Sequence, residues 1–567
     1  MSEQPKNTAK TKRPSIITVF HLDEVLKDFG SFGKFQSQRI FILLLVLYSF
    51  SIGGYNFLFA TLIPEYRCLI PECENYTQYP LEYKPEWLEN AVPFQKEKPE
   101  KCTRYEPQLE TIQECSANSF NINKTKICDT YVFKDNSFKG IAQDFDIYCD
   151  DKLWMLTLPS TMSFVGLLIS LPFNGYFSDR FGRKRTLILL IFITGCIAEI
   201  QAFFSYNYFT YISTQFLVGL VGSGVFPITY TLLLELLGPE YRSLGSFAVF
   251  SISVLGEATL ALIAMHVSHW RTMVKISTFP ALLVVLYGWL IQESIRWLLA
   301  KDKIGKANNA IKKMFEGNGV TLEMEKYQTS KPKTAEYIKE KQETFTDLFR
   351  SCPMVLRILT CMFCWISCVF VFYGITLGSV SIFGNLYLNF MMVALIEIPG
   401  NLAALIFSNK IGRKMTLSGS FIIAGLSCVG FTVIPGESWL KLLTYLLGKC
   451  AITSAFNCIY IYTTELYPTP FRQRVMGICS SVGRIGSIVA PQMPFLARIW
   501  TPLPYLIFAC MAISGGLLTL IFPETLNTTL PDSIDSALNI GKSKNDDKLG
   551  TDPSVNCKSA SGSLNLT

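Results

Sequence analysis

The chain has 567 residues, of which 50% are hydrophobic and only 17% are charged. This composition excludes a string of ordinary soluble domains, because too few polar side chains are available to cover their surfaces. The formal net charge of +7 does not indicate a nucleic-acid partner, because the basic residues cluster beside apolar runs and form no long stripe. A lipid bilayer with these basic residues on its cytosolic side is the partner that the pattern predicts.

The N-terminal residues, Met1 to Lys34, are polar, and the apolar run Ile40 to Phe59 follows them. That run approaches the length that crosses a ~30 Å hydrocarbon core, so we expect a cytosolic N-terminus without a cleavable signal peptide. Further apolar runs predict about twelve helical spans in all. Their expected first residues are Arg39, Lys152, Thr186, Tyr208, Leu244, Thr272, Met354, Leu386, Thr416, Leu440, Val475 and Leu503.

The polar stretch 64–151, between the first two spans, contains six cysteines and more acidic than basic residues. An even set of cysteines in such a loop predicts an extracellular domain that is held by disulfides. The cysteines are Cys68, Cys73, Cys102, Cys115, Cys128 and Cys149. The sequence leaves all fifteen pairings open, and it disfavours a zinc site because the stretch has no Cys-x-x-Cys pair and no histidine.

Two glycosylation sequons, at Asn75 and Asn123, lie in the same stretch and support its extracellular placement. The stretch 293–352 is rich in lysine near the end of the sixth span, which predicts a cytosolic central loop. On this topology the sequons at Asn527 and Asn565 fall in a cytosolic tail and stay unmodified.

Short motifs recur at a constant distance along the chain. Residues 179–184 read Asp-Arg-Phe-Gly-Arg-Lys and residues 409–414 read Asn-Lys-Ile-Gly-Arg-Lys, an offset of 409 − 179 = 230. Glu235 with Arg242 recurs as Glu465 with Arg472, again at 465 − 235 = 230. Glu293 is echoed by Glu524 at 524 − 293 = 231. A constant offset predicts a duplicated six-span unit with the two copies in parallel orientation.

The repeated charged residues lie where the predicted spans enter the cytosol, so acidic and basic members can pair across neighbouring helices. Pairs that hold in one conformation and break in another would act as a cytosolic latch. The candidate gating residues are Asp179, Arg183, Glu235, Arg242, Glu465 and Arg472.

These motifs carry a resemblance to a known superfamily. The element at 179–184 is similar to the signature of the major facilitator superfamily. The six-cysteine loop and the segments 293–299 and 465–469 resemble its organic cation, anion and carnitine transporters. The resemblance covers roughly Val25 to Leu526, with departures: Asn409 replaces the usual aspartate, and Gln292 and Ile295 replace prolines.

The resemblance implies an all-α membrane protein of twelve transmembrane helices in two six-helix halves, with a large disulfide-rich extracellular loop. The expected division is 1–38 (cytosolic N-terminus), 39–292 (first half, including the loop 64–151), 293–352 (central loop), 353–523 (second half) and 524–567 (cytosolic tail). It implies a plasma-membrane location and alternating access between the halves.

Other function classes fit the sequence less well. The fragment Gly541-Lys542-Ser543 lacks the first glycine and the flanking strand of a phosphate-binding loop, so an ATP-driven pump is not expected. The three histidines lie near no nucleophile or metal cluster, so no enzyme activity, cofactor or metal is expected. An organic anion transporter and a non-transporting substrate receptor on the same fold remain as alternatives, and the coupling ion stays open.

Ionisable residues inside spans mark the expected substrate site, because placing one at a helix centre costs at least ~2.5 kcal/mol. Glu257 in the fifth span, Glu397 in the eighth and Arg484 in the eleventh meet this criterion. The alternative for each is a structural ion pair between helices, which for Glu397 is the favoured interpretation.

The resemblance adds five aromatic positions where the family lines its central cavity: Phe226, Phe372, Tyr373, Phe456 and Tyr460. Aromatic faces attract alkylammonium groups. Cation transporters of this kind have an aspartate at the position of Arg484, whereas transporters of anions and of carnitine-like zwitterions have an arginine. The sequence therefore favours an amine-bearing zwitterion or a related organic cation as the substrate, unless Arg484 is permanently paired with Glu257 or Glu397.

Overall fold

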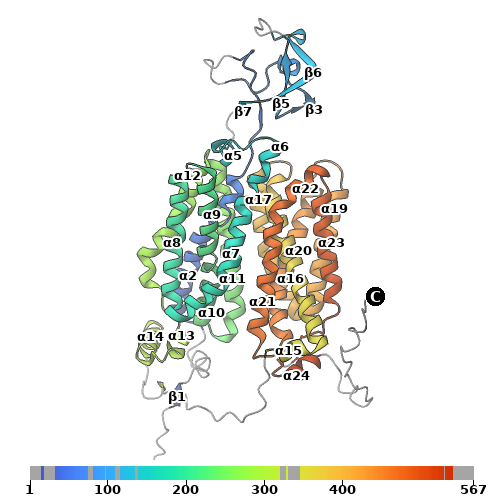
Figure 1. Cartoon of the computed structure of the whole chain (residues 1–567). Coiled ribbons are helices and arrows are strands. Elements are labelled where there is room, and N and C mark those ends of the chain that lie inside the picture. Colours follow the sequence, from blue (N-terminus) through green and yellow to red (C-terminus); the bar gives the residue numbers. More distant parts are fainter. Residues whose placement is uncertain are drawn as a thin grey trace, which may run out of the picture.

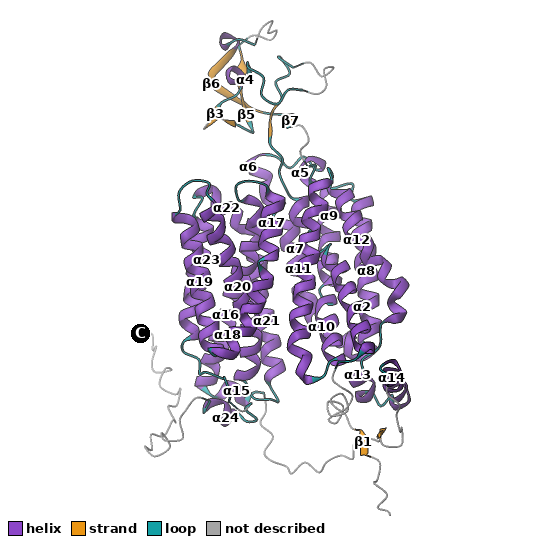
Figure 2. Cartoon of the chain, turned by 180° about the vertical axis from the view of Figure 1, so that it is seen from behind, coloured by secondary structure: helices purple, strands orange, loops and turns teal. Residues whose placement is uncertain are grey.

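The computed structural model describes residues 32–74, 81–95, 98–108, 115–134, 138–319, 345–528 and 530–540, and two short strands at 15–17 and 327–329. It consists of two helical bundles that stand side by side, with a small domain of strands above them (Figures 1 and 2). We call the end that carries this domain the outer end and the opposite end the inner end.

The first bundle supplies six spans from the described residues. It comprises α2 (Lys34–Ser51) with α3 (Asn56–Ala60), η3 (Leu153–Leu156) with α7 (Leu158–Phe181), α8 (Arg183–Phe204), α9 (Tyr208–Gly222) with α10 (Val225–Leu236), α11 (Arg242–His266) and α12 (Trp270–Tyr287) with η5 (Gly288–Leu290).

The second bundle repeats this arrangement. It comprises α16 (Cys352–Gly378) with η7 (Ser379–Ser381), α17 (Leu386–Leu395) with α18 (Glu397–Lys410), α19 (Arg413–Val433), α20 (Trp439–Leu466), α21 (Arg472–Val489) with η8 (Ala490–Gln492) and α22 (Met493–Ile499), and α23 (Leu503–Thr519).

Eight helical segments among the described residues are long and apolar enough to cross a membrane, and α23 is a shorter apolar helix. The other three spans, α7, α12 and α21, carry charged or amide side chains, among them Asn174, Lys275 and Arg484. Three expected first residues, Tyr208, Leu386 and Leu503, are those observed. The largest differences are at α2 and α7, which begin at Lys34 and Leu158.

Three spans are broken near their middle, and each break has a local cause. Gly53 and Gly54 separate α2 from α3, and Gly224 separates α9 from α10, because glycine disfavours a continuous helix. Pro399 lies four residues after Leu395, the last residue of α17, and cannot donate the backbone hydrogen bond that would continue the helix there. The breaks place Tyr55 and Glu397 at interrupted helices, which in transporters mark binding sites.

The domain at the outer end is built from short antiparallel pairs. The pairs are β2 (Tyr66–Cys68) with β7 (Tyr131–Phe133), β3 (Phe94–Gln95) with β4 (Lys98–Pro99), and β5 (Thr103–Pro107) with β6 (Phe120–Ile127). Short helices α4 (Leu88–Ala91), η2 (Ala117–Ser119), α5 (Ile141–Asp144) and α6 (Cys149–Lys152) complete it.

Three disulfides hold this domain together and select one of the fifteen pairings. They join Cys68 to Cys128, Cys73 to Cys115 and Cys102 to Cys149, with Cα–Cα distances of 5.7, 5.9 and 5.6 Å. Leu88 and Phe120 pack against the first of these in a small apolar core. Because so small a core contributes little by itself, the cross-links carry much of the stability of the domain.

The last part of the domain is fastened to the first bundle. The Asp144 carboxylate accepts hydrogen bonds from Trp270 Nε1 at 2.9 Å and Arg271 Nε at 3.0 Å, and His269 lies 3.6 Å away. Burial disfavours the charged form of Asp144, but the hydrogen bonds from His269, Trp270 and Arg271 outweigh this and lower its pKa to about 2. The carboxylate therefore stays ionised in this network throughout the physiological pH range.

Two helices of the stretch 293–352 cover the inner end of the first bundle. They are α13 (Ile295–Ala300) and α14 (Ile304–Gly317), and α14 buries Ile311, Met314 and Phe315 against Phe35 and α13. At the inner end of the second bundle lie α15 (Asp347–Arg350) and α24 (Ile534–Leu538). Strand β1 (Ser15–Ile17) pairs in parallel with β8 (Tyr327–Thr329).

Candidate functional site

The predicted charged residues lie on helices from both bundles. Glu257 belongs to α11 of the first bundle, Glu397 begins α18 and Arg484 lies on α21 of the second. Tyr55, at the break of the first span, lies within electrostatic range of all three residues. The structure therefore brings the three together around the interface between the bundles.

Among the described residues, Arg484 contacts a tyrosine and forms no ion pair with a carboxylate. Its Nη1 lies 3.4 Å from the hydroxyl oxygen of Tyr373, a long hydrogen bond, and its Nε is buried without a hydrogen-bond partner among the described residues. Neither Glu257 nor Glu397 forms an ion pair with Arg484 in the described part of the chain. The permanent pairing that the sequence left open is therefore not formed in this structure.

Glu397 instead pairs with Lys449 on α20, a residue that the sequence analysis did not select. The Lys449 Nζ lies 2.8 Å from Glu397 Oε1 and donates a hydrogen bond of 2.7 Å to Thr376 Oγ1. Lys449 is fully buried, Glu397 is 7% exposed, and the ammonium lies 3.3 Å above the Phe372 ring. An ionisable residue within the apolar run of the tenth span was the signal that could have identified Lys449.

Glu257 is partly buried and stands opposite this pair. Its Oε2 is buried without a hydrogen-bond partner among the described residues. Glu397 and Lys449 lie within electrostatic range of it. An unpartnered carboxylate oxygen in such a place costs free energy unless a bound group or water satisfies it.

Four of the five predicted aromatic residues gather on α16 and α20. The Phe372 and Phe456 ring centroids are 4.9 Å apart, and those of Phe456 and Tyr460 are 5.6 Å apart. Tyr373 contacts Phe164 of the first bundle, with 4.8 Å between centroids. These four rings therefore form one wall around Arg484 and Lys449.

Phe226 is separate from this wall. Its ring contacts are with Tyr230, at 6.3 Å, and with Phe250, at 5.5 Å, on α10 and α11 of the first bundle. Sequence position alone could not distinguish the two groups, because the direction of a side chain depends on how its helix is rotated.

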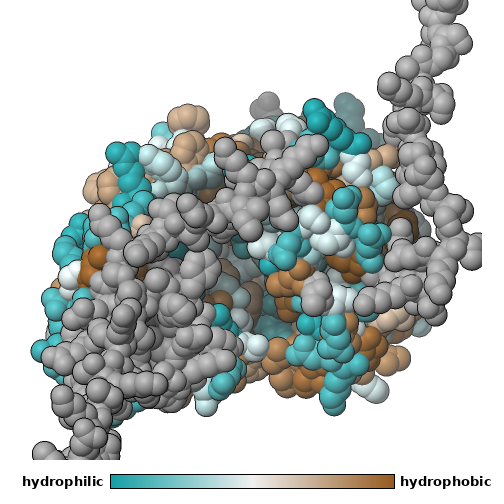
Figure 3. Space-filling view, turned by 90° about the horizontal axis from the view of Figure 1, so that it is seen from below, coloured by the Kyte–Doolittle hydropathy of each residue, from teal (hydrophilic) through white to brown (hydrophobic). Residues whose placement is uncertain are grey.

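The bundles contact each other closely on the outer side of these residues. Thr157 donates to Gln492 Oε1 at 3.0 Å, and Gln492 donates to Thr161 Oγ1 at 2.8 Å. The Phe59 ring packs on Tyr387 and Phe390 across the same interface. From the inner end, Figure 3 shows the face hollowed near its centre between the bundles. The bundles are therefore in close contact on the outer side of the site, and the hollow lies on its inner side.

A polar network at the inner end of the first bundle contains three of the predicted gating residues. Arg183 donates to Asp179 Oδ1 at 3.0 Å and to Glu235 Oε2 at 2.9 Å. The Glu293 carboxylate accepts from the backbone N–H of Lys184 at 3.1 Å. The network thus joins the inner ends of α7, α8 and α10 to the end of the sixth span.

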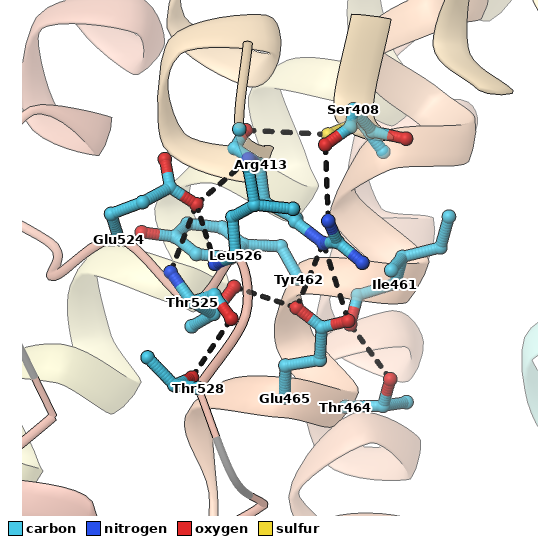
Figure 4. A network of polar contacts seen from close by, with 12 residues as sticks. Ser408, Arg413, Ile461, Tyr462, Thr464, Glu465, Glu524, Thr525, Leu526 and Thr528 are labelled. Carbon is cyan, nitrogen blue, oxygen red and sulfur yellow. Dashed lines mark hydrogen bonds and ion pairs between the residues drawn. The ribbon is translucent and has the colours of Figure 1, made fainter. Parts of the chain in front are cut away.

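The second bundle repeats this network (Figure 4). Arg413 Nε contacts both oxygens of Glu465, at 3.1 and 3.3 Å, and the Glu524 carboxylate accepts from the backbone N–H groups of Arg413 and Lys414. Arg413 Nη1 also donates to the Ser408 carbonyl at 3.1 Å. A backbone oxygen thus contacts this arginine in the second copy, in which Asn409 replaces the aspartate.

The repeated glycines explain why these turns recur. Gly182 and Gly412 have φ values of +106° and +108°, a region that side chains disfavour. A Cβ atom on either would clash with the carboxylate of Glu293 or Glu524. These two glutamates and Arg413 were visible in the repeats but were not selected as gating residues.

The two remaining gating candidates lie at helix starts. Arg242 begins α11 and Arg472 begins α21. Arg472 Nη2 donates to Thr469 Oγ1 at 3.3 Å, while its Nε is buried without a hydrogen-bond partner among the described residues.

Comparison with known proteins identifies what the chain is similar to. The family model described as "Major Facilitator Superfamily" matches residues 138–491 and 386–538. The "Organic cation transporter protein" of Drosophila melanogaster is 32% identical over 536 residues, which cover 92% of this chain and 95% of the relative. The "Organic cation/carnitine transporter 2" of Rattus norvegicus is 28% identical over 538 residues, or 91% of this chain and 94% of the relative.

Solved structures agree on the fold. The partially occluded inward open conformation of the xylose transporter XylE from E. coli matches with a TM-score of 0.53 and 18% identity, over 87% of this chain and 100% of that chain. XylE bound to 6-bromo-6-deoxy-D-glucose matches with a TM-score of 0.52 and 16% identity, over 87% and 98%. At these identities the likeness shows the fold alone.

Proposed function

Because the chain belongs to the major facilitator superfamily, and within it to the organic cation and carnitine transporter family, we propose that it carries small amine-bearing organic cations or zwitterions across the plasma membrane. The chain is a multi-pass membrane transporter of alternating-access type and not an enzyme. Carnitine-like molecules, which join an ammonium to a carboxylate, are the substrate class that we favour.

The observation that carries this proposal is the separation of opposite charges in the site. Arg484 and Glu257 each have a buried polar atom without a hydrogen-bond partner among the described residues. A guanidinium suits a carboxylate, and the buried carboxylate oxygen of Glu257, which has Tyr55 within electrostatic range, suits an alkylammonium. A zwitterion would satisfy both groups at once.

We assign different roles to the remaining predicted residues. Phe372, Tyr373, Phe456 and Tyr460, the aromatic wall around Arg484 and Lys449, would pack against the substrate from the second bundle, and Phe226 would line the first bundle. Glu397, held by Lys449 at 2.8 Å, would stabilise the frame of the site. The inner networks with Asp179, Arg183, Glu235 and Glu465, together with Arg242 and Arg472 at the starts of α11 and α21, would govern the exchange between conformations.

Replacing Arg484 by lysine tests the substrate class. We expect saturable uptake of labelled carnitine into vesicles that contain the protein, and a loss of at least about tenfold in kcat/KM for Arg484→Lys, because an ammonium cannot reproduce the two-pronged contact of a guanidinium. Uptake of an amine without a carboxylate should change much less. Arg474→Lys, the same change near the inner end of α21, is the matched control.

The outcome also separates the competing functions. Equal losses of kcat/KM for both substrates would mean that Arg484 has a structural role only. The substrate class would then be undetermined. Binding without saturable flux would favour a receptor, and preferred uptake of a dicarboxylate would favour an organic anion transporter.

We further propose that both termini are cytosolic and that the cysteine-rich domain is extracellular. Asn123 is exposed on β6, while Asn75 lies outside the described residues. Glycosidase treatment of cell-expressed protein should shift its mobility, Asn75→Gln and Asn123→Gln should each remove part of that shift, and Asn527→Gln should remove none. A glycan that persists in the Asn75→Gln/Asn123→Gln double variant would contradict this orientation.

A further inference from the structure

A cavity lies at the inner end of the first bundle, away from the interface between the halves. Its volume is about 340 Å³, within the range of small-ligand sites. The start of α2, the start of α8, the end of the sixth span, α13 and α14 line it. The transport site described above uses none of these lining residues, and only Glu293 and the backbone N–H of Lys184 belong to the inner network of the first bundle.

Four cations line this cavity: Arg39, Lys184, Lys306 and Lys313. Glu293 is the one acidic residue among its described lining residues. Arg39 donates to the Leu290 carbonyl at 2.6 Å, yet its Nε is buried without a hydrogen-bond partner among the described residues. The cavity thus has an excess of positive charge and an unsatisfied donor, which together suit an anion with several acceptor oxygens.

The amphipathic packing of α14 directs its lysines to this place. Its apolar residues, among them Ile311 and Phe315, are buried against the bundle. Lys306 and Lys313 are seven residues apart, with Asn309 and Ala310 between them on the same lining face. Both lysine side chains are exposed, so they can reach a ligand without leaving a buried partner.

An apolar strip leads from the cavity along the side of the bundle. Leu283, Leu286 and Trp289 follow one another at three-residue spacing and are 38%, 72% and 75% exposed. Trp289 also lines the cavity. A tryptophan at the inner end of an exposed apolar helix face is typical of the membrane–water boundary. The cavity therefore opens at the level where lipid headgroups lie.

We propose that this cavity binds the headgroup of a phosphorylated anionic lipid, such as a phosphatidylinositol bisphosphate, with its acyl chains along the strip of Leu283, Leu286 and Trp289. Basic pockets at the cytosolic side of membrane helices recognise such headgroups. Four cations exceed what a single phosphodiester requires, which favours a headgroup with additional phosphate groups. The apolar strip favours a lipid over a soluble phosphate.

The test measures binding of a fluorescent short-chain phosphatidylinositol bisphosphate to the full-length protein in detergent, by fluorescence anisotropy. We expect saturable binding that Lys306→Gln/Lys313→Gln weakens by about tenfold or more, because each lysine near an anionic lipid contributes substantially to attraction. Lys301→Gln/Lys312→Gln removes the same charge from exposed positions outside the cavity and should leave the affinity within about twofold.

Two results would overturn the proposal. Equal weakening by the two double variants would show attraction to net charge and not to the cavity. Competition by soluble inositol trisphosphate as strong as that by the lipid would show that the acyl chains contribute nothing. An unchanged thermal unfolding midpoint of each variant without lipid excludes misfolding as the cause.

Discussion

Replacing Lys449 by methionine should destabilise the transporter severely and abolish uptake. The substitution leaves the Glu397 carboxylate, which is 7% exposed, without its ion-pair partner. Removing one member of a buried pair costs about 3–5 kcal/mol, because an uncompensated charge remains in a medium of low polarity. Thermal unfolding of the purified protein and uptake into vesicles measure the two effects.

Two further variants separate the loss of the ion pair from a direct role of these residues in transport. The double variant Lys449→Met/Glu397→Gln removes both charges, so stability and most of the uptake should return. Lys441→Met makes the same change near the outer end of α20 and should have little effect. If the folded double variant still fails to transport, Glu397 and Lys449 act on the substrate directly, and their assignment to the frame of the site is wrong.

Neutralising the glutamates of the inner networks should slow transport more than it weakens substrate binding. Glu235 and Glu465 each pair with an arginine that is mostly buried, at 2.9 and 3.1 Å. A charge-assisted hydrogen bond of this kind contributes about 1.5–3 kcal/mol, which corresponds to a roughly ten- to hundredfold change in rate. Glu235→Gln and Glu465→Gln should therefore show a reduced kcat, measured as exchange across vesicles, with substrate affinity nearly unchanged.

Asp179→Asn tests whether the loss of rate is smaller for a more exposed member of the same network. Its side chain is 73% exposed, so its pair with Arg183 is weakened by solvent and the variant should lose less rate than Glu235→Gln. Loss of equilibrium substrate binding with normal exchange rates would contradict the gating role of both networks.

The bundle architecture could be predicted because its signals are local. Length and hydropathy fix where a span lies, and the offset of 230 between Asp179 and Asn409 reports a duplication without any knowledge of contacts. The pairing of Arg183 with Glu235 could also be predicted, since both stand at inner helix ends. The acidic and cysteine-rich composition of 64–151 indicated a folded domain in the same way.

Contacts deep between helices could not be predicted, because they depend on how each helix is rotated about its axis and on where the helices are interrupted. Lys449 is visible in the sequence as a charged residue in an apolar run, but only the packing of α18 on α20 brings Glu397 to it. Phe226 and Phe372 look equivalent in the sequence but lie in separate clusters. The pairing of the six cysteines likewise follows from the strand arrangement of the domain, which a spacing pattern does not contain.

The fastening of the outer domain determines how it travels during transport. Arg271, which binds Asp144, also donates to the carbonyls of Ala202 and Ser205 at the end of α8, and Trp270 donates its backbone N–H to Lys139. All of these contacts end on the first bundle. When the two halves rock against each other, these contacts keep the domain attached to the first half, so the domain moves together with it. The distance between the domain and the outer end of the second half then changes with the conformation of the transporter.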